Sequence, residues 1–283
     1  MKLVNADIDD TELAEWREFV GRSSVRRQIL EPEALRRYAV AVGASSGGDG
    51  LQPPLAHWAF FLDETESQFL GIDGHPRRGI GLFPPVRLPR RMFAASSVRT
   101  FAALELGVEA ILLQTIIDVK HKTGSTGDLV FLELQRVLSQ RGSVKVEEVQ
   151  TIVYRNAGGQ VSPVVVMEQQ PKLECFEWLP STVELFRFSA ATFNGHRIHY
   201  DLPYAQQEEG YPGLVVHGPL TAAKLHAVAS SRARSGLKEF SFRVKAPLFV
   251  NQPVRLVHSN EGCVVDAVRC DGVIAASATY SLG

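Results

Sequence analysis

Apolar residues recur at two spacings along the chain, and the helical spacing comes before the alternating one in the first half. A three-to-four-residue spacing predicts helices over residues 11–20, from Pro32 onward, and over residues 55–71. A Gly-rich loop, residues 43–50, separates the last two. Alternating, β-branched runs then predict strands over residues 79–83, 97–105, 110–124, 127–139 and 144–155.

The second half has a similar order of elements. We expect an opening strand at residues 183–188, a short helix after an N-cap at Ser189, and a long helix from Pro219 to about Ser230. Four strand patterns follow at residues 238–249, 253–261, 262–272 and 273–282. Such an order is typical of an α+β fold, and one long helix wrapped by an antiparallel sheet in each half would make a double hot dog.

The two halves are separated by a segment without helical spacing. Prolines and a Gly-Gly pair interrupt residues 156–181, so we expect a connector there with a boundary near Gln170. The predicted domains are residues 1–170 and residues 171–283. The sequences of the halves match poorly, so the repeat is one of architecture.

Composition narrows the class of protein. The 283 residues carry a formal net charge of −1, with 45% hydrophobic and 22% charged residues. These are globular values, and they predict no nucleic-acid or membrane partner. The three cysteines form no CxxC pair and have no metal-ligand spacing, which favours a reduced, cytoplasmic protein. The acidic N-terminus lacks the apolar core of a signal peptide, and no run approaches the ~20 apolar residues of a membrane span.

Groups capable of chemistry are densest between Thr192 and Leu225. This window holds three of the eight histidines, His196, His199 and His217, together with Asn194 and Asp201. Histidine titrates near neutral pH and can take and return a proton, while the alternative for each of these rings is a structural role. Asn194 can orient a water molecule or serve a left-handed turn, and Asp201 can hold a histidine tautomer or begin a helix.

A second candidate site is the group of arginines Arg87, Arg90 and Arg91. Guanidinium groups bind phosphates well, so these arginines can grip an anion such as a coenzyme A phosphate. A solvated turn between strands explains them equally well. Arg197, inside the histidine window, can contact a substrate carboxylate or form a surface ion pair.

Two motifs in the window resemble those of a known family. The run N-G-H-R-I-H-Y-D from Asn194 resembles the hydratase motif of MaoC-like proteins, and V-V-H-G-P-L resembles their helix entry. With R-L-P-R-R-M-F-A and F-S-F-R-V-K-A-P-L-F, the chain resembles more narrowly the type 2 hydroxyacyl-thioester dehydratases, among which are hydratases of mesaconyl-C4-CoA and itaconyl-CoA.

This resemblance implies roles for particular residues. His199 falls on the catalytic histidine, and Gly218 falls on the glycine whose N–H holds the thioester oxygen. Asn194 stands where the wider family has a catalytic Asp, and His196 and Arg197 replace its Asn and Pro. An amide cannot act as a base, so the Asp–His pair is not reproduced.

The expected function is therefore reversible hydration of an enoyl-CoA thioester, most specifically mesaconyl-C4-CoA or itaconyl-CoA giving citramalyl-CoA. No cofactor or metal is expected, and a homodimer is the expected assembly. The first half is expected to bind substrate without catalytic residues. A fatty-acid-synthesis dehydratase, a hot dog thioesterase and a non-catalytic acyl-thioester binding protein remain alternatives. Loss of enoyl absorbance, release of free thiol, or binding without turnover distinguishes them.

Overall fold

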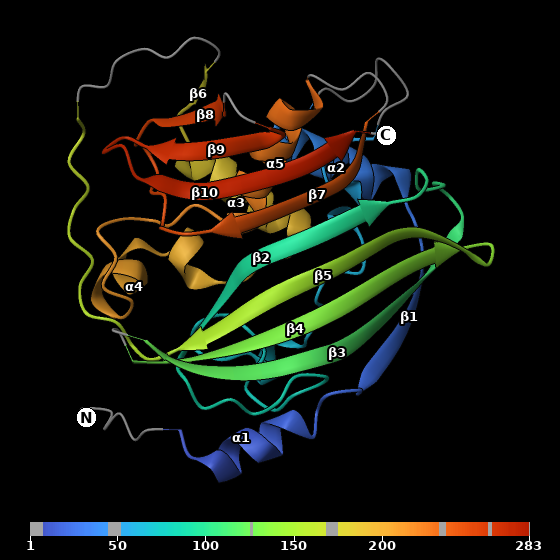
Figure 1. The fold of residues 1–283 in the computed structure, drawn as a ribbon, viewed down its shortest axis with the longest axis horizontal. Coiled ribbons are helices and arrows are strands. Elements are labelled where there is room, and N and C mark those ends of the chain that lie inside the picture. The colour runs from blue at the N-terminus through green and yellow to red at the C-terminus, as the bar shows by residue number, and fades with distance from the viewer. Residues whose placement is uncertain are drawn as a thin grey trace.

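The strands form one continuous antiparallel sheet (Figure 1). The computed structural model describes residues 8–44, 52–124, 127–167, 175–231, 236–259 and 262–282. Across the sheet the strands run in the order β1 (Ser23–Ile29), β3 (Glu109–Gly124), β4 (Gly127–Gln140), β5 (Ser143–Arg155), β2 (Arg90–Thr100), β7 (Leu237–Val244), β10 (Ile274–Leu282), β9 (Val264–Arg269), β8 (Val254–His258) and β6 (Cys175–Trp178).

The two halves of the chain meet at the centre of this sheet. Strand β2 pairs with β7, from Ala95 opposite Arg243 to Arg99 opposite Glu239. Within the described residues, β1 to β5 lie on one side of this seam and β6 to β10 on the other. This is the double hot dog arrangement. The boundary expected near Gln170 lies outside the described residues, and the division at that point stays a prediction.

Helix α5 (Gly218–Ser230) is the helix around which the second half is wrapped. It packs on β7 to β10 and also reaches β2 of the first half. Ala222, Ala223 and Ala229 are fully buried, and their small side chains allow the helix to approach the sheet closely. The helix predicted from Pro219 onward is therefore confirmed.

Two helices of similar length accompany α5. Helix α2 (Pro32–Val42) packs chiefly against α3 (Thr182–Thr192) and buries the apolar residues Leu35, Tyr38, Ala39 and Val42. Figure 1 shows α2, α3 and α5 together behind β7 to β10. The first half thus has the antiparallel sheet of a hot dog unit, but its longest helix, α2, packs against the helices of the second half.

Helix α1 (Asp10–Arg17) covers the outer part of the first-half sheet. Asp9 caps it, and the reciprocal bonds with Glu12 complete a capping box. Leu13 and Trp16 are its buried residues, and they belong to a second apolar core against β3, β4 and β5. No helix among the described residues is long and apolar enough to cross a membrane.

The helix predicted over residues 55–71 is wrong. Two short 3₁₀ helices, η1 (Ala56–Ala59) and η2 (Ser67–Phe69), lie in this segment. A buried carboxylate explains the difference: Glu148 accepts a hydrogen bond from Trp58 at 3.0 Å and lies 3.2 Å from the His57 ring. These tertiary bonds fix the backbone in a form that no regular helix provides.

The strand predicted at residues 183–188 is also wrong, and so is the N-cap at Ser189. The segment lies in α3, which begins after Ser181; the Ser181 hydroxyl accepts from the Glu184 N–H at 3.2 Å. Leu185, Phe188 and Ser189 are buried on one side, which is a helical spacing. The apolar residues of the predicted strand are divided between the two sides of this helix: Leu185 and Phe188 are buried, whereas Val183 and Phe186 are exposed.

Other differences concern short or irregular elements. Residues 79–83 form turns instead of a strand, and β2 begins at Arg90, seven residues before its predicted start. Sequence reasoning missed β1, β6 and the short helix α4 (Leu202–Gln207). Strands β1 and β6 are the two edges of the sheet, where one neighbour is absent and the apolar pattern is weakest.

Candidate active site

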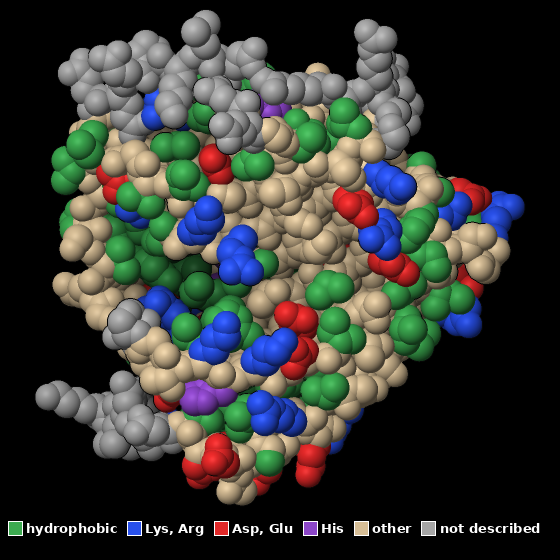
Figure 2. Space-filling model, in the orientation of Figure 1, with side chains coloured by type: hydrophobic (Ala, Val, Ile, Leu, Met, Phe, Trp, Pro, Cys, Tyr) green, Lys and Arg blue, Asp and Glu red, His purple; other side chains and the backbone are tan. Residues whose placement is uncertain are grey.

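A cavity of about 490 Å³ lies between the two halves of the chain, and its size suits an acyl thioester. Figure 2 shows a hollow with hydrophobic walls and Lys and Arg side chains beside it. Among the described residues that line the cavity, the acidic side chain is Asp63 and the permanently basic ones are Arg91, Arg155 and Lys245. The site is therefore apolar with an excess of positive charge, which favours an anionic ligand.

His199 lies on the cavity wall with one ring nitrogen committed. It ends the short 3₁₀ helix η3 (Arg197–His199), and its Nδ1 lies 2.7 Å from the Val215 carbonyl oxygen. A carbonyl only accepts, so Nδ1 carries the hydrogen and Nε2 keeps a lone pair. Burial lowers the pKa of His199 to about 4, so the ring is neutral at pH 7 and is able to accept a proton.

Gly218 is the first residue of α5 and lines the same cavity. A Cβ at this position would lie 3.1 Å from Cγ2 of Val244 and 3.4 Å from the Phe93 carbonyl oxygen, and Val244 and Phe93 are both cavity residues. The bare backbone N–H therefore stands at the positive end of a 13-residue helix with no side chain in the way. Such a group can hold the developing charge on a thioester oxygen.

Asn194 and His196 form the neighbouring part of the wall. The Asn194 side-chain oxygen accepts from the His196 N–H at 3.0 Å, which fixes the turn that follows α3. Both residues line the cavity. Burial and the charges of His75 and His199 lower the pKa of His196 far below its ordinary value, so its ring is neutral.

His217 supports His199 from behind. Its ring is fully buried and stacks on His199 with centroids 3.6 Å apart and planes 22° from parallel. Its Nε2 lies 2.8 Å from the Ser189 hydroxyl. Burial lowers the pKa of His217 well below its ordinary value, so a neutral ring fixes the plane of the His199 imidazole.

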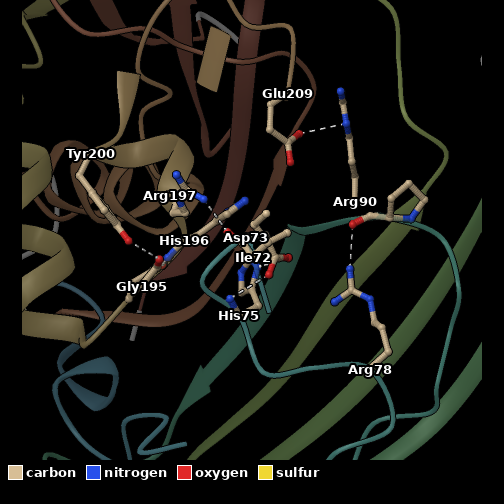
Figure 3. A network of polar contacts seen from close by, with 12 residues as sticks. Ile72, Asp73, His75, Arg78, Arg90, Gly195, His196, Arg197, Tyr200 and Glu209 are labelled. Atoms are coloured by element: carbon tan, nitrogen blue, oxygen red, sulfur yellow. Dashed lines mark hydrogen bonds and ion pairs between the residues drawn. The ribbon is translucent and has the colours of Figure 1, made fainter. Parts of the chain in front are cut away.

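A loop of the first half brings another histidine to the site. His75 lines the cavity, and its ring centroid lies 4.2 Å from that of His196 (Figure 3). The Asp73 carboxylate lies 3.1 Å from His75 Nδ1. The sequence did not reveal this pair, because Asp73 and His75 lie far from residues 192–225 along the chain and no local pattern places their loop beside them.

The predicted arginine site separates into three different environments. Arg87 pairs with Glu12 outside the cavity. Arg90 is buried and pairs with Glu209 at 3.0 Å. Arg91, the next residue of β2, lines the cavity together with Met92 and Phe93.

Arg197 and Asp201 lie outside the cavity lining and bind each other. The guanidinium donates to Asp201 at 2.6 Å and to the Ile72 carbonyl oxygen at 3.0 Å. Asp201 also accepts from the Tyr204 N–H at 3.1 Å and caps α4. In the structure Arg197 therefore forms an ion pair, and Asp201 begins a helix. Neither residue contacts the cavity in the way that the catalytic interpretation expected.

Comparisons with known proteins give the family. Residues 55–250 match the model of the family described as hydroxyacyl-thioester dehydratase type 2. The chain is 41% identical over 281 residues to mesaconyl-C(4)-CoA hydratase of Chloroflexus aurantiacus, covering 95% of this chain and 99% of that protein. This chain belongs to the hydroxyacyl-thioester dehydratase type 2 family.

More distant similarities agree with the fold of this type 2 dehydratase family. The structure of HtdX of Mycobacterium tuberculosis superposes with a TM-score of 0.67 at 18% identity, covering 93% of this chain and all of that one. A MaoC-like dehydratase of Phytophthora capsici gives a TM-score of 0.66 at 15% identity, with 95% and 98% covered. The family membership makes the chain a hydro-lyase of the hydratase/dehydratase type, and no cluster of metal-binding side chains occurs among its described residues.

Proposed function

We propose that this hydro-lyase hydrates mesaconyl-C4-CoA to citramalyl-CoA. The observation that carries the proposal is one cavity that joins a neutral imidazole, His199, to the free N–H of Gly218 and the guanidinium of Arg91. The relative from Chloroflexus aurantiacus, which is named for this substrate and covers nearly the whole chain, supports it.

The chemistry follows from the positions of these groups. His199 Nε2 takes a proton from water as the water oxygen bonds to the β-carbon. The electron pair of the double bond moves toward the thioester oxygen, and the Gly218 N–H at the start of α5 stabilises that charge. The double bond then re-forms between carbon and oxygen, and the α-carbon takes up a proton.

Arg91 accounts for the free carboxylate of this substrate. In mesaconyl-C4-CoA the carboxylate is attached to the β-carbon, so it must lie near the histidines. Arg91 acts electrostatically on both His75 and His196, which places its charge in that part of the cavity. Within the described residues, Arg91 has a ring contact with Phe83 and no hydrogen-bonded or ion-paired partner. It is therefore available to bind a carboxylate.

Substitution of Arg91 tests this assignment. We expect Arg91→Met to lower kcat/KM for mesaconyl-C4-CoA by about 10- to 100-fold. This is the loss of rate that corresponds to losing one hydrogen bond between charged groups. Crotonyl-CoA, which lacks the carboxylate, should be affected little. Arg87→Met is the matched control, since Arg87 pairs with Glu12 outside the cavity. Turnover is followed by loss of the enoyl absorbance, with a thiol reagent to detect thioester cleavage.

A shortened substrate separates the two anions that Arg91 can bind. The mesaconyl thioester of N-acetylcysteamine carries the carboxylate but no phosphate. If Arg91→Met affects this thioester as strongly as mesaconyl-CoA, Arg91 binds the carboxylate. If the loss occurs with both CoA esters and not with the short thioester, Arg91 binds a CoA phosphate and the carboxylate assignment fails. Itaconyl-CoA, which also carries a carboxylate, belongs in the same comparison.

Two further expectations concern the setting of the enzyme. We propose a homodimer, for which the exposed apolar side chains of Val183 and Phe186 on α3, each 65% exposed, offer a contact surface. A cytoplasmic location agrees with the free thiols of Cys175, Cys263 and Cys270.

A further inference from the structure

The loop that carries Asp73 and His75 holds an imidazole in a form suited to proton transfer. Asp73 contacts His75 twice: one carboxylate oxygen accepts from the His75 backbone N–H at 3.0 Å, and the other lies 3.1 Å from Nδ1. The carboxylate thereby holds the hydrogen on Nδ1 and leaves Nε2 with a lone pair. The His75 side chain is 21% exposed and lines the cavity, so it can meet a bound substrate.

Several contacts fix this loop against the histidine window. The Arg197 backbone N–H donates to the Asp73 carbonyl oxygen at 3.0 Å, and the Arg197 guanidinium donates to the Ile72 carbonyl oxygen (Figure 3). Gly74 lies in the left-handed region with φ +86°, and a Cβ there would come within 1.9 Å of the Gly195 carbonyl oxygen. The two segments come from different halves of the chain, so their backbones can meet only because Gly74 has no side chain.

We propose that His75 is a second catalytic acid–base group, that it exchanges the proton at the α-carbon, and that Asp73 is its positioning residue. This inference rests on the proposed hydration of an enoyl thioester. It supplies from the first half of the chain the carboxylate–imidazole pair that Asn194 cannot form. The first half, which the sequence led us to expect to be non-catalytic, then contributes directly to the reaction.

The reaction needs two acid–base groups in opposite protonation states: one that takes a proton and one that gives a proton. During hydration neutral His199 takes a proton from water, the water oxygen bonds to the β-carbon, and the double-bond electrons pass to the thioester oxygen. The imidazolium form of His75 then gives its Nε2 proton to the α-carbon as the thioester carbonyl re-forms. His199 ends protonated and His75 neutral, and proton exchange with water restores both. Dehydration runs the same steps in reverse.

Groups around His75 shift its pKa in both directions. Burial, the largest cause, lowers the pKa of His75, and the charges of Arg91 and Arg78 lower it further, while the hydrogen bond and charge of Asp73 raise it; the net shift is downward. The resting ring is therefore neutral, as the base that takes the α-proton in dehydration must be, and for hydration it first takes up a proton from water. His196 faces the ring from the other segment. Although burial acts in the opposite direction, the hydrogen bond and charge of His75 and the charge of Arg78 hold the pKa of Asp73 below its ordinary value. Asp73 is therefore ionised and balances the imidazolium charge when His75 carries its second proton.

Two substitutions and one control test the role of His75. We expect His75→Ala to lower kcat by at least about 100-fold with little change in KM, because general acid–base catalysis contributes on the order of 10² to 10⁴. Added imidazole should restore part of the rate by entering the space left at the cavity wall. His121→Ala is the matched control: His121 also pairs with a carboxylate, Asp128 at 2.7 Å, but it lies outside the cavity lining. Circular dichroism and thermal melting verify that each variant is folded.

Asp73→Asn separates catalysis from support of the loop. The amide oxygen can still accept from the His75 N–H, but the negative charge is lost. We expect kcat to fall and the isotope effect for dehydration of α-deuterated citramalyl-CoA to rise, because the transfer at the α-carbon becomes slower. A role only in loop structure would lower thermal stability and leave the isotope effect unchanged.

The results distinguish this inference from the proposed function. Wild-type turnover is measured first with mesaconyl-C4-CoA and crotonyl-CoA. If the enzyme hydrates crotonyl-CoA but not mesaconyl-C4-CoA, the substrate assignment is overturned. Near wild-type kcat for folded His75→Ala, on whichever thioester the enzyme hydrates, overturns the role of His75. Loss of rate without rescue by imidazole and without a changed isotope effect in Asp73→Asn also overturns it.

Discussion

Replacing Gly218 with alanine should damage catalysis far more than folding. The new Cβ would lie 3.1 Å from Cγ2 of Val244, so that side chain must move by a few tenths of an ångström. The contact with the Phe93 carbonyl oxygen, at 3.4 Å, is ordinary. Since Gly218 lies in a helix without a positive φ, alanine suits its backbone, and we expect the free energy of unfolding to change by less than about 1 kcal/mol.

The effect on rate should be much larger. The added methyl group would stand beside the N–H that meets the thioester oxygen and would push the acyl group away from it. Loss of one such donor typically costs about 10²- to 10³-fold in kcat. The assay compares kcat for enoyl-thioester hydration with the melting temperature of the same preparation.

Gly213→Ala is the matched control for this substitution. A Cβ on Gly213 meets nothing within 4 Å, and this residue is not part of the cavity lining. It should retain both activity and stability. If Gly218→Ala turns over substrate at nearly the wild-type rate, the Gly218 N–H does not hold the thioester oxygen. If Gly218→Ala instead fails to fold, the expectation that Val244 can give way is wrong.

Three further predictions concern pH, an ion pair and assembly. Because burial lowers the pKa of His199 from 6.5 to about 4, the unfolded chain binds its proton first, so stability should fall as pH drops from 6.5 toward 4, by on the order of 3 kcal/mol from this group. Urea unfolding at several pH values measures this, and His199→Gln should flatten the slope; an unchanged slope contradicts the burial argument. Arg197→Met should lower activity modestly and equally with mesaconyl-C4-CoA and crotonyl-CoA, since Arg197 lies outside the cavity lining and its guanidinium only helps to hold the loop of His75 through the Ile72 carbonyl oxygen; a selective loss with mesaconyl-C4-CoA would show that it binds the substrate carboxylate. Phe186→Glu should convert a dimer to monomers in light scattering if α3 forms the interface; an unchanged mass excludes that surface.

Local sequence patterns were enough to predict much of the scaffold and one side of the site. The long alternating runs predicted β3, β4 and β5, and the Pro219 start predicted α5, because these elements depend on local spacing and chain entry. The motif residues His199 and Gly218 could likewise be found from sequence, and both line one cavity.

Other features depend on contacts between distant segments, which local patterns do not contain. The segment around Trp58 takes its irregular form from Glu148, 90 residues further along the chain, and no local pattern contains that bond. The same holds for His75, which reaches the site because Gly74 allows its loop to touch Gly195. Burial and pairing also separated Arg90 from Arg91, which the sequence presents as equivalent neighbours. Local spacing fixes where helices and strands form, but the energy of a buried charge or a close backbone approach depends on groups that only folding brings together.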